Sequence, residues 1–434
     1  MKSTISTLLF FVLFVSASIT NALPQTKNTI ENVFTLELKF GDENLPDEYL
    51  LANPGSFVVN DAGDIYISDE IRIKVYTKDG KPKLIIGRPG QGPGEFNSPP
   101  SIFISPAGYI TASDFASSQI RFYNFYTPAS KFIEKNRFDK QQLFKKIDGN
   151  YQYSSLDGLS CFLVNDKEKI YQGFMTYFKS DEAVGTSYHI LAYEKSGTFK
   201  VLVKQEMLGS AIAQYQGQKA HLGGIDLGGF YWSILPDNKI VYINTVSDKR
   251  VEKEKGWYTF HIISFPPEAV LFSETTSETK DIEIEFVPKE IPKSVIDFRQ
   301  NYDFSKPVGH IWKAIDDVMI ERAKKIKYQP PFTFMFTDGY FVFTVNEDYK
   351  NSKQEFECID LKTGKKVFST TFAGNQRTVE TTLRDGRKIT EKVVDFLVTY
   401  NSIIKNGYLY KIKSGQNIYP VVEKYRIDPA VYGK

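Results

Sequence analysis

Apolar and polar positions alternate along much of the chain, and the clearest example lies near the N-terminus. Gly63–Asp69 (GDIYISD) and Arg72–Tyr76 (RIKVY) place isoleucine or valine at every second position, and Lys78–Gly80 (KDG) follows them. A period of two is the pattern of a half-buried β-strand. Two such runs, separated by a short connection, predict an antiparallel hairpin. The turn at Lys78–Gly80 then predicts that a further strand follows the hairpin.

A looser copy of this pattern follows about 45 residues later, which is the length of a blade-type repeat. Gly108–Asp114 (GYITASD) leads into Gln119–Tyr123 (QIRFY). A repeat of this size built from strands predicts a β-propeller, in which four-stranded antiparallel blades surround a central axis. We expect blade one near residues 56–87 and blade two near residues 101–133.

The same rhythm continues in more divergent form and predicts four further blades. These begin near Leu159, Phe230, Phe332 and Leu397. The last has only three predicted strands, whereas Val33–Phe40 (VFTLELKF) is a strand without a blade. We therefore expect an all-β, six-bladed propeller whose ring is closed by the N-terminal strand, since closure removes an exposed sheet edge. Seven blades are the main alternative, because residues 134–158 leave room for irregular strands.

Four segments interrupt the repeat: residues 135–158, 205–229, 289–328 and 378–393. The second is rich in glycine, and the fourth has the pattern of a polar hairpin around Asp385-Gly386. The third gives the only strong helical signal. Its apolar residues fall on one stripe, which comprises Ile311, Ile315, Val318, Met319 and Ile326. Long loops on a rigid scaffold often carry recognition residues, so these interruptions are the first places to look for function.

The first residues have the pattern of a secretory signal peptide. Lys2 precedes an apolar core, Leu8–Val15, and cleavage is expected after Ala22. This core is too short to span a bilayer comfortably. Residues 1–22 are therefore expected to be removed, and residues 23–434 to form a soluble propeller without stable membrane insertion. We expect the mature protein in the periplasm or outside the cell.

Composition and charge narrow the picture only slightly. The 434 residues include 54 basic and 52 acidic ones, a balance that offers no basic face for nucleic acid. The two cysteines, Cys161 and Cys358, fall in predicted strands of different blades, so we expect packed thiols rather than a disulfide. No Asn-x-Ser/Thr sequon is present. Its absence from an exported chain of this size favours a bacterial origin.

Residues 63–80 resemble the NHL repeat. The pattern of that family is Gly-Asp-Ile-Tyr-(Ile/Val)-small-Asp, then a basic residue, Ile-x-Val-Tyr and an (Asp/Asn)-Gly turn. The connection Gly87–Phe96 (GRPGQGPGEF), with Pro99 soon after, also looks like that family's link between blades. The resemblance covers residues 56–133 and implies the propeller fold, and many exported bacterial propellers of unassigned role are similar. It does not choose an activity, since the family includes peptide-amidating lyases, sensor domains and RNA- or protein-binding modules.

Motifs with established chemistry are scarce. The sequence contains no nucleophile elbow, no His-Glu-x-x-His and no P-loop. The four histidines are His189, His221, His261 and His310. Only His221 is predicted in a loop, so we expect no metal site and no cofactor. Asp69 and Asp114 end equivalent strands, and we expect each to cap its own loop by accepting backbone N–H bonds rather than to bind a cation.

Two functions stay open on this basis. The first is a monomeric binding or scaffolding module that recognises a peptide, protein or glycan through the face carrying the blade-to-blade loops. Its candidate ligand contacts are Arg88, Gln91, Glu95, Phe96, Tyr215, His221 and Asp226. The second is a propeller hydrolase or lyase with acids such as Asp226 and Asp338 at the central channel, with calcium as a candidate ion. No catalytic residue is assigned for it.

Overall fold

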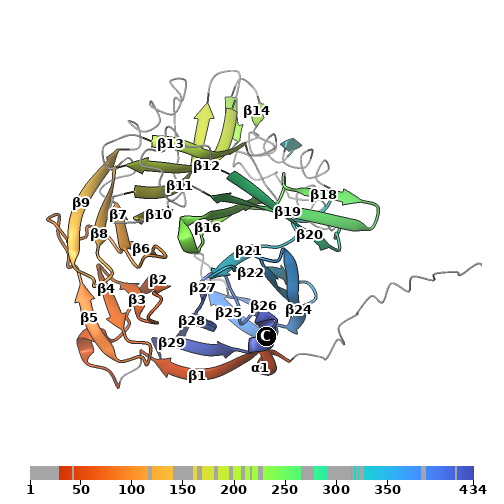
Figure 1. The fold of residues 1–434 in the computed structure, drawn as a ribbon. Coiled ribbons are helices and arrows are strands. Elements are labelled where there is room, and N and C mark those ends of the chain that lie inside the picture. Colours follow the sequence, from red (N-terminus) through yellow and green to blue (C-terminus); the bar gives the residue numbers. More distant parts are fainter. Residues whose placement is uncertain are drawn as a thin grey trace, which may run out of the picture.

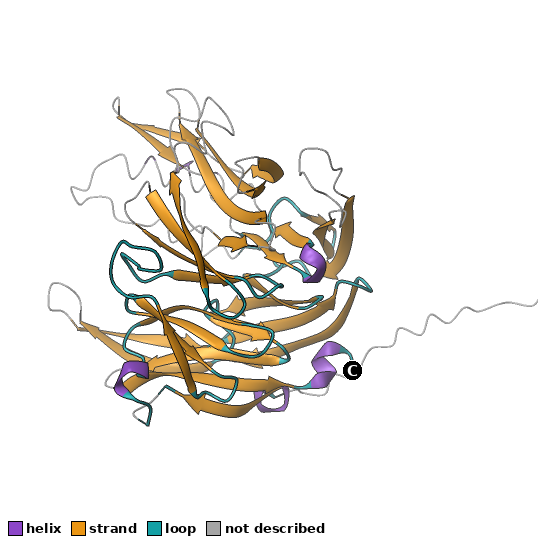
Figure 2. Cartoon of the chain, turned by 60° about the vertical axis from the view of Figure 1, so that its left-hand side comes forward, coloured by secondary structure: helices purple, strands orange, loops and turns teal. Residues whose placement is uncertain are grey.

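The computed structural model describes residues 29–41, 44–115, 120–139, 160–163, 169–179, 184–194, 199–206, 211–215, 218–222, 228–264, 278–291, 314, 317–318, 321, 327–382, 388–415 and 418–434. Strands dominate these residues and are arranged as blades around a central axis (Figure 1). A second view shows that the helices are short and lie outside the sheets (Figure 2). The chain is therefore an all-β propeller, as predicted. The expected signal peptide lies outside the described residues.

The first three blades follow the chain in order, with each strand pairing antiparallel to the one before it. Blade one consists of β2 (Pro54–Val59), β3 (Ile65–Asp69), β4 (Arg72–Tyr76) and β5 (Pro82–Ile86). Blade two consists of β6 (Ser101–Ile104), β7 (Ile110–Phe115), β8 (Ile120–Tyr126) and β9 (Phe132–Asp139). Blade three consists of β10 (Ser160–Leu163), β11 (Lys169–Lys179), β12 (Val184–Glu194) and β13 (Phe199–Glu206).

Blade four has five strands because its second strand is interrupted. Its strands are β16 (Phe230–Ile234), β17 (Ile240–Asn244), β18 (Lys249–Glu252), β19 (Lys255–Ser264) and β20 (Glu278–Phe286). β17 and β18 pair with opposite ends of β19, while β20 pairs with β19 along its other edge. The four-stranded plan is thus kept, with a break at residues 245–248. The 3₁₀ turn η2 (Pro236–Asn238) joins β16 to β17.

Blades five and six complete the ring. Blade five consists of β21 (Phe334–Asp338), β22 (Phe341–Asp348), β23 (Lys353–Asp360) and β24 (Lys365–Ala373). Blade six consists of β27 (Ser402–Lys405), β28 (Tyr408–Gly415), β29 (Ile418–Ile427) and the N-terminal β1 (Phe34–Phe40). Phe34 lies opposite Ile427 and Phe40 opposite Val422. The predicted closure is therefore confirmed, and the described strands form six sheets around the axis.

Short helices and two hairpins lie outside the blades. The helices are α1 (Ile30–Val33), η1 (Asp47–Tyr49) and η3 (Pro429–Tyr432). The hairpin β25 (Asn375–Thr382) and β26 (Lys388–Asp395) matches the predicted polar hairpin. The glycine-rich segment, expected as a loop, contains a hairpin of β14 (Ala211–Tyr215) and β15 (Gln218–Leu222). Most of the predicted helical insertion lies outside the described residues, but residues 314, 317, 318 and 321 are helical.

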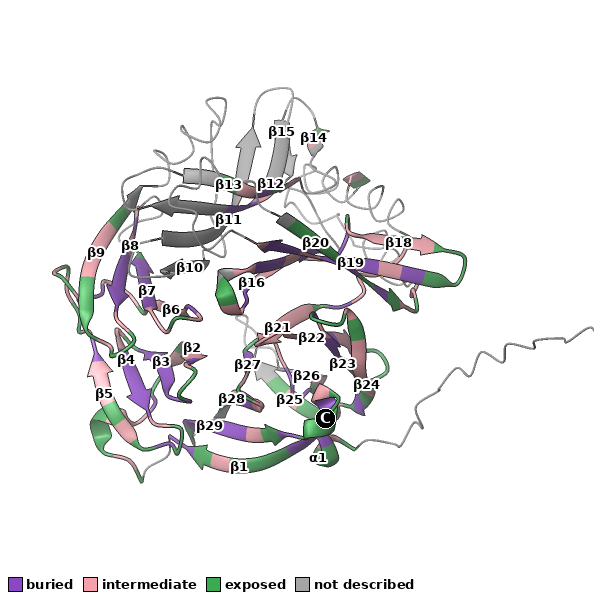
Figure 3. Cartoon of the chain, in the orientation of Figure 1, coloured by how far each residue is buried: buried purple, intermediate pink, exposed green. Residues whose placement is uncertain are grey.

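The hydrophobic core is divided among the seams between neighbouring blades. Separate clusters of buried residues lie between blades one and two, three and four, four and five, five and six, and six and one. Figure 3 shows buried residues concentrated on β3, β4 and β8, with exposure rising on outer strands such as β5 and β1. Both faces of a middle strand are covered by neighbouring blades, so its side chains on either face are normally apolar.

The direction of the strands divides the ring into two faces. Within each blade the strands alternate in direction, so the fourth strand ends on the face where the next blade begins. All blade-to-blade connections therefore lie on one face, together with the turns between second and third strands. We call this the connection face. It carries residues 87–100, both hairpins and the ends of the long insertion between blades four and five.

Candidate functional site

The predicted contacts at residues 88–96 are held by bonds within their own loop. Arg88 Nε lies 2.8 Å from Glu95 Oε1, and Glu95 Oε2 accepts a 2.8 Å bond from the Gly92 amide. These bonds, the Gly92 amide first and the Arg88 guanidinium second, lower the pKa of Glu95. Gly90 adopts a φ of +151°, and a Cβ there would lie 2.2 Å from the Glu95 carboxylate. Glu95 thus stabilises the loop, and Arg88 and Gln91 remain exposed.

Phe96 is a core residue rather than a surface contact. Its side chain is 0% exposed and packs in the cluster between blades one and two. Its burial removes it from the candidate ligand contacts, because a ligand on the connection face cannot reach it. Its position in a loop predicts a surface residue, and that prediction is wrong. Two features account for the burial. Phe96 is apolar, and its ring lies against Gly87, where a Cβ would lie 2.2 Å from Phe96 Cε2.

The remaining predicted contacts are only partly placed. Tyr215 and His221 belong to the β14–β15 hairpin, where Tyr215 pairs with Gln218 and His221 pairs with Ile212. Their side chains, and Asp226 altogether, lie outside the described residues. The ligand roles proposed for these three residues therefore stay predictions.

Asp69 and Asp114 accept backbone N–H bonds, as predicted, but from the chain that enters the blade rather than from their own loops. Asp69 is fully buried and accepts bonds from the amides of Ala52 and Asn53, at 3.1 and 2.6 Å, and from Lys74 Nζ at 2.7 Å. Asp114 accepts bonds from the amide and the side-chain nitrogen of Asn97, at 2.6 and 2.9 Å. Each carboxylate therefore fixes the chain that enters its blade.

Candidate catalytic groups do not gather in the described part of the chain. Asp338 accepts bonds from the amides of Asn406 and Gly407 and from the Tyr432 hydroxyl, at 2.9, 2.8 and 2.8 Å. His189 is buried, and its burial lowers its pKa to about 4. Within the described residues, no three His, Cys, Asp or Glu side chains are grouped as metal ligands would be. Cys358 is a buried free thiol, consistent with the expectation of no disulfide.

A large groove lies between blades four and five, and described residues line it. Its main part has a volume of about 680 Å³ and runs between β20 and the sheet of β22, β23 and β24. A second part of about 420 Å³ extends it towards the β22–β23 turn. The two parts share Lys289, Pro330 and Asn346. We call the whole cavity the seam groove.

One wall of the seam groove is polar because two rungs of polar residues cross three paired strands. The first rung is Asn346, Glu355 and Thr371, and the second is Thr344, Glu357 and Ser369. Side chains two residues apart on a strand point to the same face, so both glutamates of β23 face blade four. The intervening Phe356 faces the opposite way, into the cluster shared with blade six.

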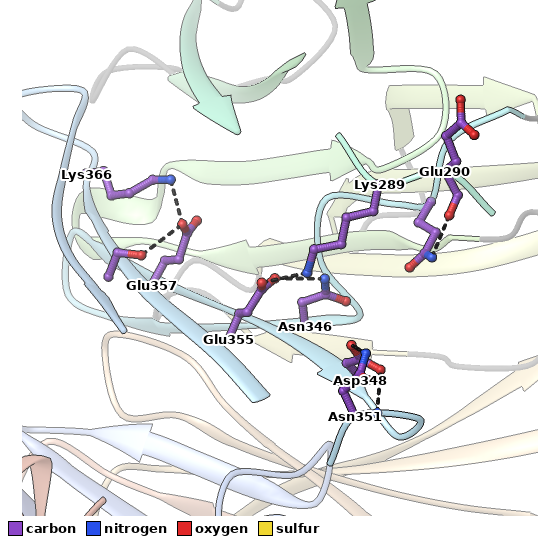
Figure 4. Close-up of polar contacts among 10 residues, drawn as sticks. Lys289, Glu290, Asn346, Asp348, Asn351, Glu355, Glu357 and Lys366 are labelled. Carbon is purple, nitrogen blue, oxygen red and sulfur yellow. Dashed lines mark hydrogen bonds and ion pairs between the residues drawn. The ribbon is translucent and has the colours of Figure 1, made fainter. Parts of the chain in front are cut away.

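Each glutamate in this wall is matched by a lysine (Figure 4). Lys289 Nζ lies 2.6 Å from Glu355 Oε1, and Asn346 Nδ2 donates a 3.1 Å bond to Glu355 Oε2. Lys366 Nζ lies 2.6 Å from Glu357 Oε1, which also accepts a 3.3 Å bond from the Ser369 hydroxyl. All four charged side chains are between 22% and 39% exposed. A charge without a partner would be costly here, so the lysines keep the wall stable.

The opposite wall is largely apolar. Phe286 and Pro331 are half-buried, and Val287 is 77% exposed. Behind them lies the fully buried Tyr258, whose pKa is raised by burial and by the nearby Glu357 carboxylate. The seam groove is therefore amphipathic, with hydrogen-bonding groups on one side and hydrocarbon on the other.

The seam groove lies at the base of the long insertion. The two ends of that insertion pair at an isolated antiparallel bridge between Glu290 and Tyr328. Gln329 donates a 2.8 Å amide bond to the Lys289 carbonyl and a side-chain bond of 2.9 Å to the Glu290 carbonyl (Figure 4). Lys249 Nζ donates bonds of 2.7 and 3.0 Å to the carbonyls of Tyr328 and Gln329. The insertion thus leaves and re-enters the ring at a fixed point beside the groove.

Three exposed tyrosines lie on the connection face, and one of them, Tyr349, lines the second part of the groove. Tyr349, Tyr400 and Tyr419 are 60%, 77% and 50% exposed. Tyr349 lies in the β22–β23 turn, Tyr400 precedes β27, and Tyr419 follows the β28–β29 turn, so all three belong to this face of blades five and six. The Tyr349 ring packs edge-on against Phe396 at 5.3 Å, which fixes its position.

The sequence contains a pattern that indicates the seam groove, although the pattern matches no catalytic or binding motif. Residues 353–360 (KQEFECID) alternate polar and apolar, as a half-exposed strand would. In a propeller, however, the third strand of a blade has a neighbouring blade on each side. Two glutamates on one face of such a strand therefore indicate a polar opening in the seam.

Comparison with known proteins supports the fold and leaves the activity open. The profile of a family described as a 6-bladed beta-propeller matches residues 36–208, which is less than half of the chain. No curated protein matches. The described residues include no helix that is both long and apolar enough to cross a membrane.

Several solved structures are similar at low sequence identity. One is a protein from Bacteroides fragilis NCTC 9343 whose name describes its export as inferred. The two chains are 12% identical with a TM-score of 0.43, and the match covers 93% of this chain and 98% of that one. Another is a chain of a mitotic checkpoint complex, with 9% identity, a TM-score of 0.35 and coverage of 91% and 94%. A third is hydrazine synthase from Kuenenia stuttgartiensis, with 11% identity, a TM-score of 0.30 and coverage of 74% and 71%.

Proposed function

We propose that this chain is an exported, NHL-type propeller that acts as a binding or scaffolding module and takes its ligand on the connection face. The observation that carries this proposal is the seam groove, which opens on that face beside the insertion and near exposed tyrosines. Its ligand is a peptide, a protein or a glycan. The pattern of residues 1–22 supports export to the periplasm or beyond.

The chemistry of this face suits binding without a reaction. Tyrosine offers a large, rigid ring and a hydroxyl at little cost in conformational entropy, which is why it is common in recognition surfaces. Glu355 and Glu357 in the groove are engaged with lysines, and the candidate acids Asp69, Asp114 and Asp338 each hold backbone amides. These groups position the chain, which leaves them poorly suited to move protons.

A direct test uses residues 23–434 on peptide and glycan arrays, followed by calorimetry on any hit. We expect Tyr349→Ala and Tyr400→Ala each to weaken binding by about tenfold, which corresponds to about 1.4 kcal/mol. Leu36→Ala is the matched control, because Leu36 is 50% exposed on β1, away from the connection face. Equal losses in all three variants, or no ligand in either array, would refute the proposal.

Export has its own measurement. Expression of the full chain in a bacterial host with a periplasm should give a mature protein whose first residue is Leu23, as read by intact mass. Retention of residues 1–22 on a cytoplasmic product would contradict export and would leave the binding role to be judged by the arrays.

A further inference from the structure

We propose that the seam groove binds an uncharged glycan, as a segment of a pyranose chain; this inference rests on the binding role proposed above. Three properties of the described residues support it: the charge balance in the main part of the groove, the chemistry of its two walls and the side chains that the polar wall presents.

The charges that line the main part of the seam groove are balanced. Glu355 and Glu357 pair with Lys289 and Lys366. Glu283 and Glu285 also line this part, and they pair with Arg250 at 3.0 Å and with Lys255 at 3.1 Å. A charged ligand would have to displace one of these partners or meet a like charge. The lining of the main part therefore favours a ligand without net charge.

The second part of the groove adds Glu347, Asp348 and Lys350. Glu347 accepts a bond from the Tyr349 hydroxyl, and Asp348 accepts one from the Asn351 side chain.

The two walls match the two kinds of surface on a pyranose ring. Such a ring presents C–H groups on its faces and hydroxyl groups around its edge. The hydrocarbon of Phe286, Val287 and Pro331 suits the C–H faces of the ring. The two polar rungs place donors and acceptors side by side, which suits the hydroxyl groups at the edge of the ring because a hydroxyl both donates and accepts. Rungs two residues apart on a strand are roughly 7 Å apart, so a repeating chain can meet both.

The polar wall of the seam groove presents side chains to a ligand. Peptides that bind along a sheet pair with the free backbone groups of an edge strand. This wall is instead the face of β22, β23 and β24, in which β22 and β23 are paired along both edges and β24 along one. What the wall offers is side chains, among them the hydroxyls of Ser369 and Thr371. Both parts of the groove have volumes within the roughly 300–1,000 Å³ common for small-ligand sites.

The experiment is calorimetry on residues 23–434 with neutral hexasaccharides of glucose, mannose and xylose, an anionic heparin hexasaccharide, and a peptide array. Thr371→Val and Glu357→Gln remove hydrogen-bonding capacity with little change of shape. We expect a neutral hexasaccharide to bind and each substitution to weaken it by about tenfold. Thr35→Val and Glu37→Gln on β1 are matched controls and should leave affinity unchanged. Thermal unfolding of every variant checks that the fold is kept.

The outcomes separate this inference from the proposed function. Binding of peptides alone, or of the anionic hexasaccharide alone, would overturn the uncharged glycan and leave the binding role standing. Binding of a neutral hexasaccharide that neither groove variant weakens would overturn the seam groove as its site. No binding by any probe would overturn both.

Discussion

At the scale of single residues, the charged side chains of this propeller are held by particular partners. Lys74 and Asp69 are almost fully buried, and Lys74 Nζ also donates to the Leu50 carbonyl. A buried charge is tolerated when its partner and hydrogen bonds are in place and becomes costly when the partner is removed. Asp69 therefore secures the entry into blade one through both charge and backbone contacts.

The Asp69–Lys74 pair gives a sharp stability prediction. Asp69→Asn should lower the free energy of unfolding by about 3–5 kcal/mol, because Lys74 keeps its charge but loses its counter-charge. Urea unfolding followed by fluorescence measures the change. Asp79→Asn is the control, since Asp79 is exposed in a turn and should shift the value by less than about 0.5 kcal/mol. Similar losses in the two variants would contradict the assigned role.

His261 should make stability depend on pH. Its Nε2 lies 3.4 Å from Asp248 Oδ2 and its Nδ1 lies 2.8 Å from Asp281 Oδ1, and these carboxylates, Asp248 first, raise its pKa. The folded state thus binds the proton more tightly than the unfolded chain, whose value is about 6.5. The stabilisation is complete below that pH and is lost as pH rises through the raised pKa.

The measurement is an NMR titration of His261 together with unfolding at several pH values. Wild-type protein should lose more stability than His261→Gln between pH 6 and 9. Asp248→Asn should move the histidine pKa back down, because Asp248 is the larger cause of the rise. A wild-type pKa at or below 6.5 would contradict the predicted coupling.

At the scale of elements, β1 is the strand that completes the ring. Phe34 is 3% exposed, and its ring centroid lies 5.4 Å from that of Phe356 and 5.7 Å from that of Phe372, both in blade five. β1 therefore pairs with blade six and also fills the seam with blade five. Its outward residue Leu36 is half exposed and makes no comparable contribution.

Removal of the Phe34 ring tests this closure. Phe34→Ala should lower the free energy of unfolding by about 3–5 kcal/mol, the usual effect of deleting a buried phenylalanine. Leu36→Ala on the same strand should cost about 0.5 kcal/mol or less. Thermal and urea unfolding of both variants compare them. A Phe34→Ala loss as small as that of Leu36→Ala would indicate that β1 is dispensable for the ring.

Elements differed in how well the sequence predicted them. Strands with strict alternation and glycine turns, such as those of blade one, were predicted within a few residues. The hairpin β14–β15 was missed because its glycine-rich surroundings resemble a loop. The seam groove was missed because Glu355 and Glu357 lie on opposite sides of Phe356 in sequence, and only the packing of two blades shows that their shared face is enclosed. The NHL-type assignment itself stays a prediction.

At the scale of the whole molecule, the seams determine what each blade can do. Among the described residues, five seams contain apolar clusters, and the seam between blades four and five combines such a cluster with a polar groove. The cluster extends from β17 to the outer strand β20 and stabilises the seam, while the polar part adjoins the connection face. Binding chemistry can therefore vary in one seam without loss of the ring.

Calcium should not stabilise the ring if the protein is a binding module. An ion that binds only the folded state raises the melting temperature with concentration, whereas one with no site does not. We expect 1 mM calcium and 1 mM EDTA to give melting temperatures within about 1 °C of each other. A rise of several degrees in calcium would instead favour the hydrolase or lyase alternative and would call for a search of the central channel.

The pairing of β1 with β29 also affects how fast the ring can fold. β1 is the first described strand along the chain and β29 is the last, so their contacts join residues that lie very far apart in sequence. Structures dominated by such distant contacts fold slowly, because loop-closure entropy is lost before the contacts form. Until β29 is in place, the sheet of blade six is incomplete and β1 is an unpaired edge. The step that most limits the yield of native protein should therefore be the final joining of the two ends, during which β1 is open to pairing with other chains.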